Sequence, residues 1–165
     1  MPIKSILSEV IRRAEISATQ ASADAFAATV VSTGISTTGN FGWLLKRIEF
    51  EVDPDIIVAA PQTADCSLQL QVAAGVQQTN LLLPNSNDFI AQMQMCMPGI
   101  AASTSAYSLP TQYVWEAPDN LVLVDPDLSL ILDSTGTGAV NVGTARIYYF
   151  PIELNELDIL RLIAG

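Results

Sequence analysis

The residues with the clearest capacity for chemistry are the carboxylates of two Asp-Pro-Asp segments. Asp53 and Asp55 form the first segment, and Asp125 and Asp127 form the second. Clustered carboxylates supply the oxygen ligands that Ca²⁺ prefers, and a carboxylate pair can also act as general acid and base. Aspartate beside proline is first of all a turn-forming sequence, because its side chain accepts local backbone hydrogen bonds. We expect turns at both segments, with a calcium site as the main functional alternative and a catalytic pair as a weaker one.

The rest of the chain offers little for catalysis. It contains no histidine, which excludes the usual serine and cysteine triads and imidazole metal ligands. The tract 134–138 contains two glycines but lies between two predicted strands, not before a helix as a phosphate-binding loop would. Cys66 and Cys96 have no metal-ligand spacing, and we expect reduced thiols in preference to a disulfide. We therefore predict that the protein is not an enzyme and has no cofactor other than the calcium ion considered above.

Charge is scarce and unevenly distributed. Charged residues make up 15% of the 165-residue chain, against about 25% in a typical soluble domain. The net charge of −10 argues against nucleic-acid binding by the body of the protein. The N-terminal segment is basic, however, so contact with nucleic acid, lipid headgroups or an acidic neighbour is expected only through Lys4, Arg12 and Arg13. A surface so poor in charge contains neutral or apolar patches, which usually mark contacts with other molecules.

Most of the sequence alternates with a period of two, as half-buried antiparallel strands do. In residues 67–74 aliphatic side chains alternate with serine and glutamine, and in 89–97 methionines alternate with glutamines. Further strands are predicted at 26–30, 43–52, 112–116, 121–125, 128–133 and 140–150. The pattern predicts an all-β fold, an antiparallel β-sandwich or barrel, in one domain that spans residues 1–165. No run approaches 18 consecutive apolar residues, so we expect no transmembrane helix.

Short helices are predicted at both ends of this domain. Within the first 15 residues, 3–14 show the spacing of an amphipathic helix. Because a helix this short is marginal in water, it must dock on its own domain, on a neighbouring subunit or on a membrane surface. A second helix is expected over 155–164, with Asn155 as its N-cap. The apolar stripes of the two helices contain Ile3, Ile6, Leu7 and Val10 in the first and Leu157 and Leu160 in the second.

The glutamines in the predicted strands are a less ordinary signal. They occupy solvent faces on which lysine and glutamate normally keep a sheet soluble. Neutral amides can hydrogen-bond to a neighbour without the cost of burying a charge, so they suit a face that another subunit covers; a merely neutral surface is the alternative. The candidate subunit-contact residues are Ile3, Ile6, Leu7, Val10, Gln69, Gln71, Gln92, Gln94, Leu157 and Leu160.

The order of these features resembles small viral coat proteins with a single β-sandwich of the jelly-roll kind. The resemblance rests on SATQASADAF leading into a strand, on FGWLLKRIEFEV, and on the late segments YVWEAPDNLVLVDPDLSLIL and ARIYYFPIEL before a terminal helix. It implies a jelly-roll fold and a structural, self-assembling shell in a virion, with copies of itself and other virion proteins as partners.

The chain lacks the long arginine-rich arm of many coat proteins, which favours a shell around an internal membrane or a genome packaged by other proteins. The alternative is a carbohydrate-binding or virion-attachment module, extracellular or at the cell surface, that uses Trp115, Tyr113 and a calcium site.

Overall fold

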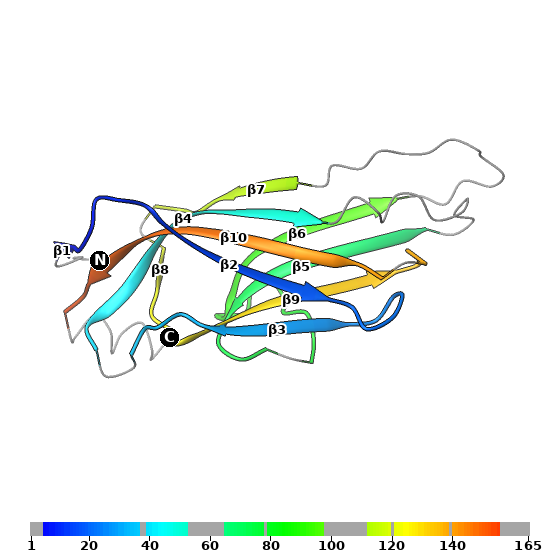
Figure 1. Cartoon of the computed structure of the whole chain (residues 1–165), viewed down its shortest axis with the longest axis horizontal. Coiled ribbons are helices and arrows are strands. Elements are labelled where there is room, and N and C mark those ends of the chain that lie inside the picture. The colour runs from blue at the N-terminus through cyan, green and yellow to red at the C-terminus, as the bar shows by residue number, and fades with distance from the viewer. Residues whose placement is uncertain are drawn as a thin grey trace.

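The computed structural model describes residues 5–36, 39–52, 65–77, 79–97, 112–119, 121–138 and 140–155, and all regular structure within these ranges is β-strand (Figure 1). The strands are β1 Ser5–Ile6, β2 Arg12–Thr19, β3 Ala27–Ser32, β4 Phe41–Val52, β5 Cys66–Ala74, β6 Phe89–Met97, β7 Gln112–Glu116, β8 Val122–Leu123, β9 Asp127–Thr135 and β10 Val142–Glu153. The same ranges hold no apolar helix of the length that crossing a lipid bilayer requires.

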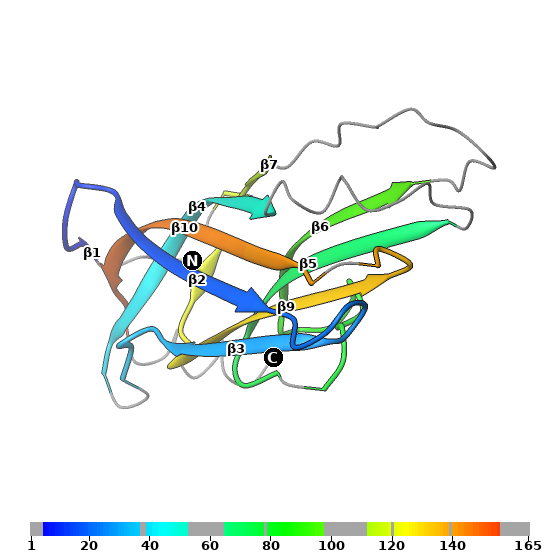
Figure 2. The ribbon, with the colours of Figure 1, turned by 45° about the vertical axis from the view of Figure 1, so that its right-hand side comes forward.

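The strands form two antiparallel sheets that lie face to face (Figures 1 and 2). In the six-stranded sheet, β1 and β2 both pair with β10, β10 pairs with β4, and β4 pairs with β7 and β8. The four-stranded sheet has the order β3-β9-β5-β6. Without the two-residue strands β1 and β8, the orders β2-β10-β4-β7 and β3-β9-β5-β6 are those of two interlocked Greek keys, which define a jelly roll. The predicted all-β jelly-roll sandwich is therefore confirmed.

The core lies between the two sheets and follows the predicted alternation. The six-stranded sheet contributes Ile48, Phe50 and Ile147, and the four-stranded sheet contributes Leu70 and Leu132. These side chains are fully buried, and their neighbours along each strand point to the outer faces. Period-two patterning thus decides which side chains meet between the layers.

Strict alternation over 43–52 would place Leu44 on the same face as Ile48, but the alternation breaks near the start of β4. The register between β4 and β10 shifts next to Lys46, which is an extra residue in β4. Such a β-bulge reverses the alternation, so Leu45 and Trp43 join Ile48 in the core while Leu44 points to the other face. A second, smaller apolar cluster on that face consists of Leu44, Ile152 and Leu154.

The predicted N-terminal helix over 3–14 is also wrong, as far as the described residues 5–14 show. Ser5 and Ile6 pair with the end of β10, and from Arg12 onward the chain pairs with β10 as β2. An isolated helix of this length gains little in water, whereas the edge of β10 offers unpaired backbone donors and acceptors to an extended chain. Of the predicted helix 155–164, Asn155 is not helical, and residues 156–165 lie outside the described part of the chain.

Buried polar side chains close one end of the sandwich. Gln20 Nε2 donates a hydrogen bond to Ser134 Oγ at 2.9 Å, and Asn141 Nδ2 donates to Gln20 Oε1 at 2.6 Å. Both the backbone N–H and the hydroxyl of Thr137 donate to Asp24 Oδ1 at 2.8 Å. The network joins the turn after β2 to the connection between β9 and β10, which lie in different sheets.

The Asp24 carboxylate in this network predicts a loss of stability in acid. Burial raises its pKa, but hydrogen bonds from Thr137, Gly138 and Ser134 outweigh burial and hold the pKa below the ordinary value of 3.8. Because the folded-state pKa is the lower one, the stabilisation is present above the unfolded-state pKa and is lost as pH falls through the folded-state pKa. Asp24 has a φ of 56°, which asparagine also tolerates. We expect the melting temperature of Asp24→Asn to fall less between pH 5 and pH 2 than that of the wild type; equal slopes in thermal melts would contradict this.

Candidate functional site

The second Asp-Pro-Asp segment forms a turn, as expected. Asp125 Oδ1 accepts a hydrogen bond from the backbone N–H of Asp127 at 3.0 Å, and the Asp125 carbonyl accepts one from Thr33 Oγ1 at 2.9 Å. Asp53 and Asp55 lie outside the described residues. Within the described ranges, no three acidic or cysteine side chains come together in a way that could hold a metal ion. The calcium site stays a prediction.

The strand glutamines lie on the outer face of β5 and β6. Gln69 is opposite Gln94, and Gln71 is opposite Gln92. Gln92 Nε2 donates to Gln69 Oε1 at 3.3 Å, and Gln92 Oε1 accepts from Gln71 Nε2 at 3.4 Å. We call these four residues the amide ladder. Gln69 and Gln92 are half-buried and Gln94 is exposed, so these three side chains can reach a neighbouring molecule.

The prediction that Gln71 contacts a neighbouring subunit is wrong, because the chain itself covers this side chain. Gln71 is 0% exposed. Its Oε1 accepts a hydrogen bond from the backbone N–H of Leu82 at 2.7 Å, and its Nε2 donates to the Leu82 carbonyl at 2.9 Å. The segment between β5 and β6 is thereby fastened to the outer face of β5. Strand alternation shows the face on which Gln71 lies but not what covers it.

Replacing Gln71 by leucine is expected to destabilise the fold and loosen this segment. The substitution keeps the side-chain volume but leaves the N–H and C=O of Leu82 without their partner, which costs about 1–3 kcal/mol. Urea unfolding measures the stability, and limited proteolysis measures cleavage near Leu82. Gln94→Ala, at an exposed position on the same face, is the matched control and is expected to stay within about 0.5 kcal/mol of the wild type. Equal stability of Gln71→Leu and Gln94→Ala would contradict the role of Gln71.

An apolar bulge protrudes from the edge of the six-stranded sheet between β1 and β2. Between the paired residues Ile6 and Arg12, the five residues Leu7–Ile11 lie opposite only two residues of β10. One of these two is Pro151, which has no N–H to donate to the ladder, while its carbonyl accepts a hydrogen bond from Leu7 N at 2.9 Å. The excess chain must leave the plane of the sheet.

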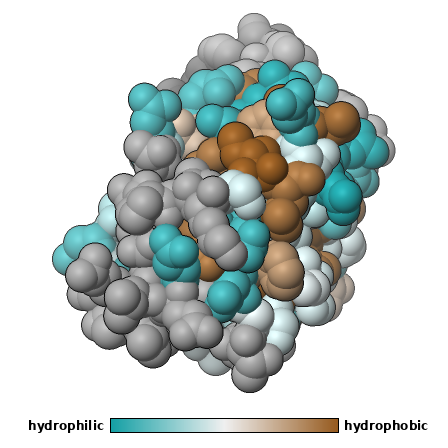
Figure 3. Space-filling model, turned by 90° about the vertical axis from the view of Figure 1, so that its left-hand side faces the viewer, coloured by the Kyte–Doolittle hydropathy of each residue, from teal (hydrophilic) through white to brown (hydrophobic). Residues whose placement is uncertain are grey.

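The bulge carries apolar side chains into solvent. Val10 is 71% exposed, and Ile6, Leu7 and Ile11 are each about half exposed. Figure 3 looks onto this end of the molecule and shows brown apolar side chains gathered among polar ones. Phe41 is also half exposed, and it starts the strand that pairs with the same end of β10. Because Ile6 lies opposite Ile152 and Phe41 lies opposite Glu153, Phe41 projects from the other face of the sheet. The end patch therefore consists of Ile6, Leu7, Val10 and Ile11.

Ile6, Leu7 and Val10 are thus accessible, as subunit-contact residues must be, and their contact itself stays a prediction. The other predicted contact residues Ile3, Leu157 and Leu160 lie outside the described residues. Lys4 also lies outside them. Arg12 and Arg13 are exposed beside the patch, and Arg13 Nη2 lies 3.9 Å from Glu15 Oε2. Nucleic-acid contact through these three basic residues stays a prediction.

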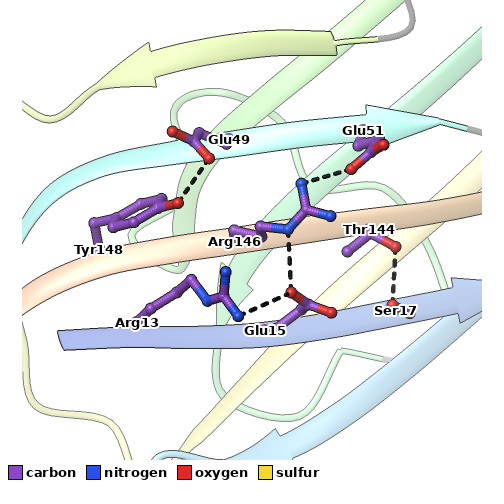
Figure 4. Close-up of polar contacts among 8 residues, drawn as sticks. All are labelled: Arg13, Glu15, Ser17, Glu49, Glu51, Thr144, Arg146 and Tyr148. Atoms are coloured by element: carbon purple, nitrogen blue, oxygen red, sulfur yellow. Dashed lines mark hydrogen bonds and ion pairs between the residues drawn. The ribbon is translucent and has the colours of Figure 1, made fainter.

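The outer face of the six-stranded sheet pairs its charges internally (Figure 4). Arg146 on β10 lies between two carboxylates, with its Nε 3.1 Å from Glu15 Oε2 and its Nη1 2.5 Å from Glu51 Oε2. Both contacts raise the pKa of the Arg146 guanidinium, and the hydrogen bond to Glu51 has the larger effect. Two residues further along β10, on the same face, Tyr148 Oη donates a hydrogen bond to Glu49 Oε2 at 2.8 Å. The arrangement balances positive with negative charge and does not form a basic surface that attracts phosphates.

The aromatic pair of the carbohydrate-binding alternative faces the sandwich. Trp115 is half-buried and packs against the core. Tyr113 stacks on Phe50 with ring centroids 6.4 Å apart. Both side chains therefore contribute to packing at β7, but Tyr113 remains 45% exposed, so the carbohydrate-binding alternative stays a prediction. The two thiols also point apart, since Cys66 is buried and Cys96 is exposed on adjacent strands.

Comparisons with known proteins agree with the topology. No protein-family model and no curated protein matches the sequence. The chain is similar to the solved structure of apo chimpanzee polyomavirus VP1, with 7% identity, a TM-score of 0.53 and coverage of 94% of this chain and 100% of that one. It is also similar to the unassembled KI polyomavirus VP1 pentamer (9% identity, TM-score 0.49, 90% and 97% covered) and to tomato aspermy virus (8%, 0.40, 84% and 76%). The first of these likenesses supports the jelly-roll fold that the strand pairings define.

Proposed function

We propose that this protein is a structural, self-assembling shell component of a virion and performs no catalysis. The observation that carries the proposal is the end patch, a group of exposed apolar side chains that protrudes from the edge of a jelly-roll sheet. The free energy falls when another surface covers protruding apolar side chains, and such patches mark protein contacts. The fold it shares with a polyomavirus VP1 supports a viral shell as the setting.

Two surfaces provide the contacts between subunits in this proposal. The end patch forms one of them, and Ile3, Leu157 and Leu160, which lie outside the described residues, remain proposed contact residues. The exposed part of the amide ladder forms the other. The partners are copies of the same chain and other virion proteins, and the location is the virion. Because the face around Arg146 neutralises its own charge, genome contact is confined to Lys4, Arg12 and Arg13.

Size-exclusion chromatography with light scattering, followed by negative-stain electron microscopy, tests the proposal on the purified chain. We expect closed particles or rings of subunits whose abundance increases with protein concentration. A stable monomer at concentrations well above a micromolar would contradict assembly. Glycan binding by that monomer, strengthened by Ca²⁺, would instead favour the carbohydrate-binding module.

A further inference from the structure

The edge strand β6 lacks the features that normally prevent a sheet edge from pairing with another chain. Natural proteins protect edges with charges, prolines, bulges or short strands. The six-stranded sheet is protected in this way, because β2 carries Arg12, Arg13 and Glu15 and the five-residue β7 carries Glu116. The nine residues Phe89–Met97 of β6 contain no charge, proline or glycine. In the described part of the chain, β6 pairs only with β5.

We propose that β6 pairs with β6 of a second copy of this chain, antiparallel and about a two-fold axis at Met93. The two four-stranded sheets would then form one continuous sheet of eight strands. This inference rests on the proposed self-assembly and specifies one of its contacts. A two-fold contact uses the same surface on both copies, and pairing between exposed edges is a common mode of strand recognition.

The sequence of β6 is self-complementary in this register. Met93 is the central residue of Phe89–Met97, so the axis there uses the strand along its full length. Gln92 then lies opposite the partner's Gln94, at the Cβ separation of about 4.5–5.5 Å that directly opposed residues have. Each copy contributes one amide to each of these two symmetric pairs.

The amide ladder provides the hydrogen-bonding groups for such a contact. It already crosses from β5 to β6 through the bond from Gln92 to Gln69. Gln94, next to the edge, is exposed, and its Nε2 donates only to Cys96 Sγ at 3.6 Å, which is a weak acceptor. An opposing amide offers a strong donor and a strong acceptor, and no charge is desolvated.

The other face of β6 also suits the pairing. Met93 and Met95 are buried at 4% and 9% exposure and belong to the core. Their flexible side chains can repack at a new boundary between two sandwiches. The edge strand β3 is uncharged too, but it is shorter, with six residues, and lies beside β2 (Figures 1 and 2). Thus β6 is the longest uncharged edge among the described strands.

Disulfide trapping tests the pairing and its register in the full-length chain. Gln92→Cys and Gln94→Cys are made as separate variants, each also carrying Cys96→Ser, and are co-expressed with different tags. After mild oxidation, we expect a mixed disulfide dimer on a non-reducing gel when both variants are present, and no dimer from either variant alone. Gln69→Cys with Cys96→Ser, on the same face but one strand further from the edge, is the matched control and is expected to give no dimer with either.

Trapping and particle formation give separate outcomes. Particles without the mixed dimer would overturn the β6 contact while leaving the shell function standing. The mixed dimer without particles would support the contact and contradict the shell. A dimer from one variant alone, or from the Gln69→Cys control, would overturn the axis at Met93.

A second variant tests the same contact if a substitution at the half-buried Gln92 prevents folding. Gln94→Lys places a charge at the edge, on a side chain that is already exposed. We expect loss of the dimer in light scattering, while circular dichroism shows the same β-sheet content as the wild type and unfolding in urea stays cooperative. Unchanged association of Gln94→Lys would overturn the proposal.

Discussion

Replacing Leu7 and Val10 by serine is expected to abolish assembly while leaving the subunit folded. Their side chains are 49% and 71% exposed, so the substitutions remove little from the folded monomer, within about 0.5 kcal/mol for each exposed site. Burying the part of each side chain that is still exposed contributes about 1–2 kcal/mol, and a closed shell repeats that loss at every equivalent contact. Light scattering and electron microscopy are expected to show particles for the wild type and isolated subunits for the double variant.

Val140→Ser is the matched control for this prediction. Val140 is 52% exposed but precedes β10, at the opposite end of that strand from the end patch. We expect it to assemble as the wild type does. Particles formed equally well by Leu7→Ser/Val10→Ser would exclude the end patch as a subunit contact. Deleting residues 1–14 is a poor substitute, because the deletion removes β1 and the start of β2 together with the patch.

Gly143→Ala is expected to destabilise the sandwich more than a single methyl group would suggest. Gly143 lies on β10 opposite Leu70 of the other sheet, and a Cβ there would overlap Leu70 Cδ2 and lie 3.0 Å from Leu70 Cγ. Leu70 is fully buried, so it cannot move aside without displacing the core. Overpacking of this kind costs about 1–3 kcal/mol, occasionally more, and outweighs the small gain from restricting the unfolded chain. Urea unfolding of the two proteins measures the difference.

A double-mutant cycle with Leu70→Ala isolates the proposed clash. Leu70→Ala alone creates a cavity and costs about 2–5 kcal/mol. In Gly143→Ala/Leu70→Ala the new methyl group occupies part of that cavity, so the combined loss is expected to be smaller than the sum of the two single losses. Additive losses would show that Gly143 is not constrained by Leu70.

The strands of the sandwich were predictable because a strand buried on one face alternates apolar and polar residues along the sequence. β5, β6 and β10 follow their predicted ranges closely. Only two residues, Val122–Leu123, form the strand predicted at 121–125. The bulge at Lys46 was not predictable from alternation, because the irregularity is defined by the register with β10. Pairing across the sheet carries information that one strand alone does not.

The N-terminal error has a similar cause. Ile6, Leu7, Val10 and Ile11 have helical spacing, yet they belong to a two-residue strand and an exposed bulge. Spacing on a single segment cannot distinguish an apolar helix face from apolar side chains that remain exposed on an irregular segment. They remain candidate contact residues although the segment is not helical, because this prediction depends on their apolar character. Gln71 shows the reverse case, in which the face was predicted correctly but Leu82 covers it.

The pairing of β2 with β10 delays the folding of β2 during synthesis on the ribosome. Thr19 pairs with Val142, so roughly 120 residues must be synthesised after β2 before its partner exists, which takes about 6–24 s at the usual rate of 5–20 residues per second. During that interval β2 lacks the strand with which it pairs, and the uncharged strand β6 is complete before β10 is made. Folding must then close this long loop, which favours slow folding. Translation on crowded polysomes is therefore where this protein is most exposed to premature association, and chaperones that bind extended apolar segments are expected to raise its yield.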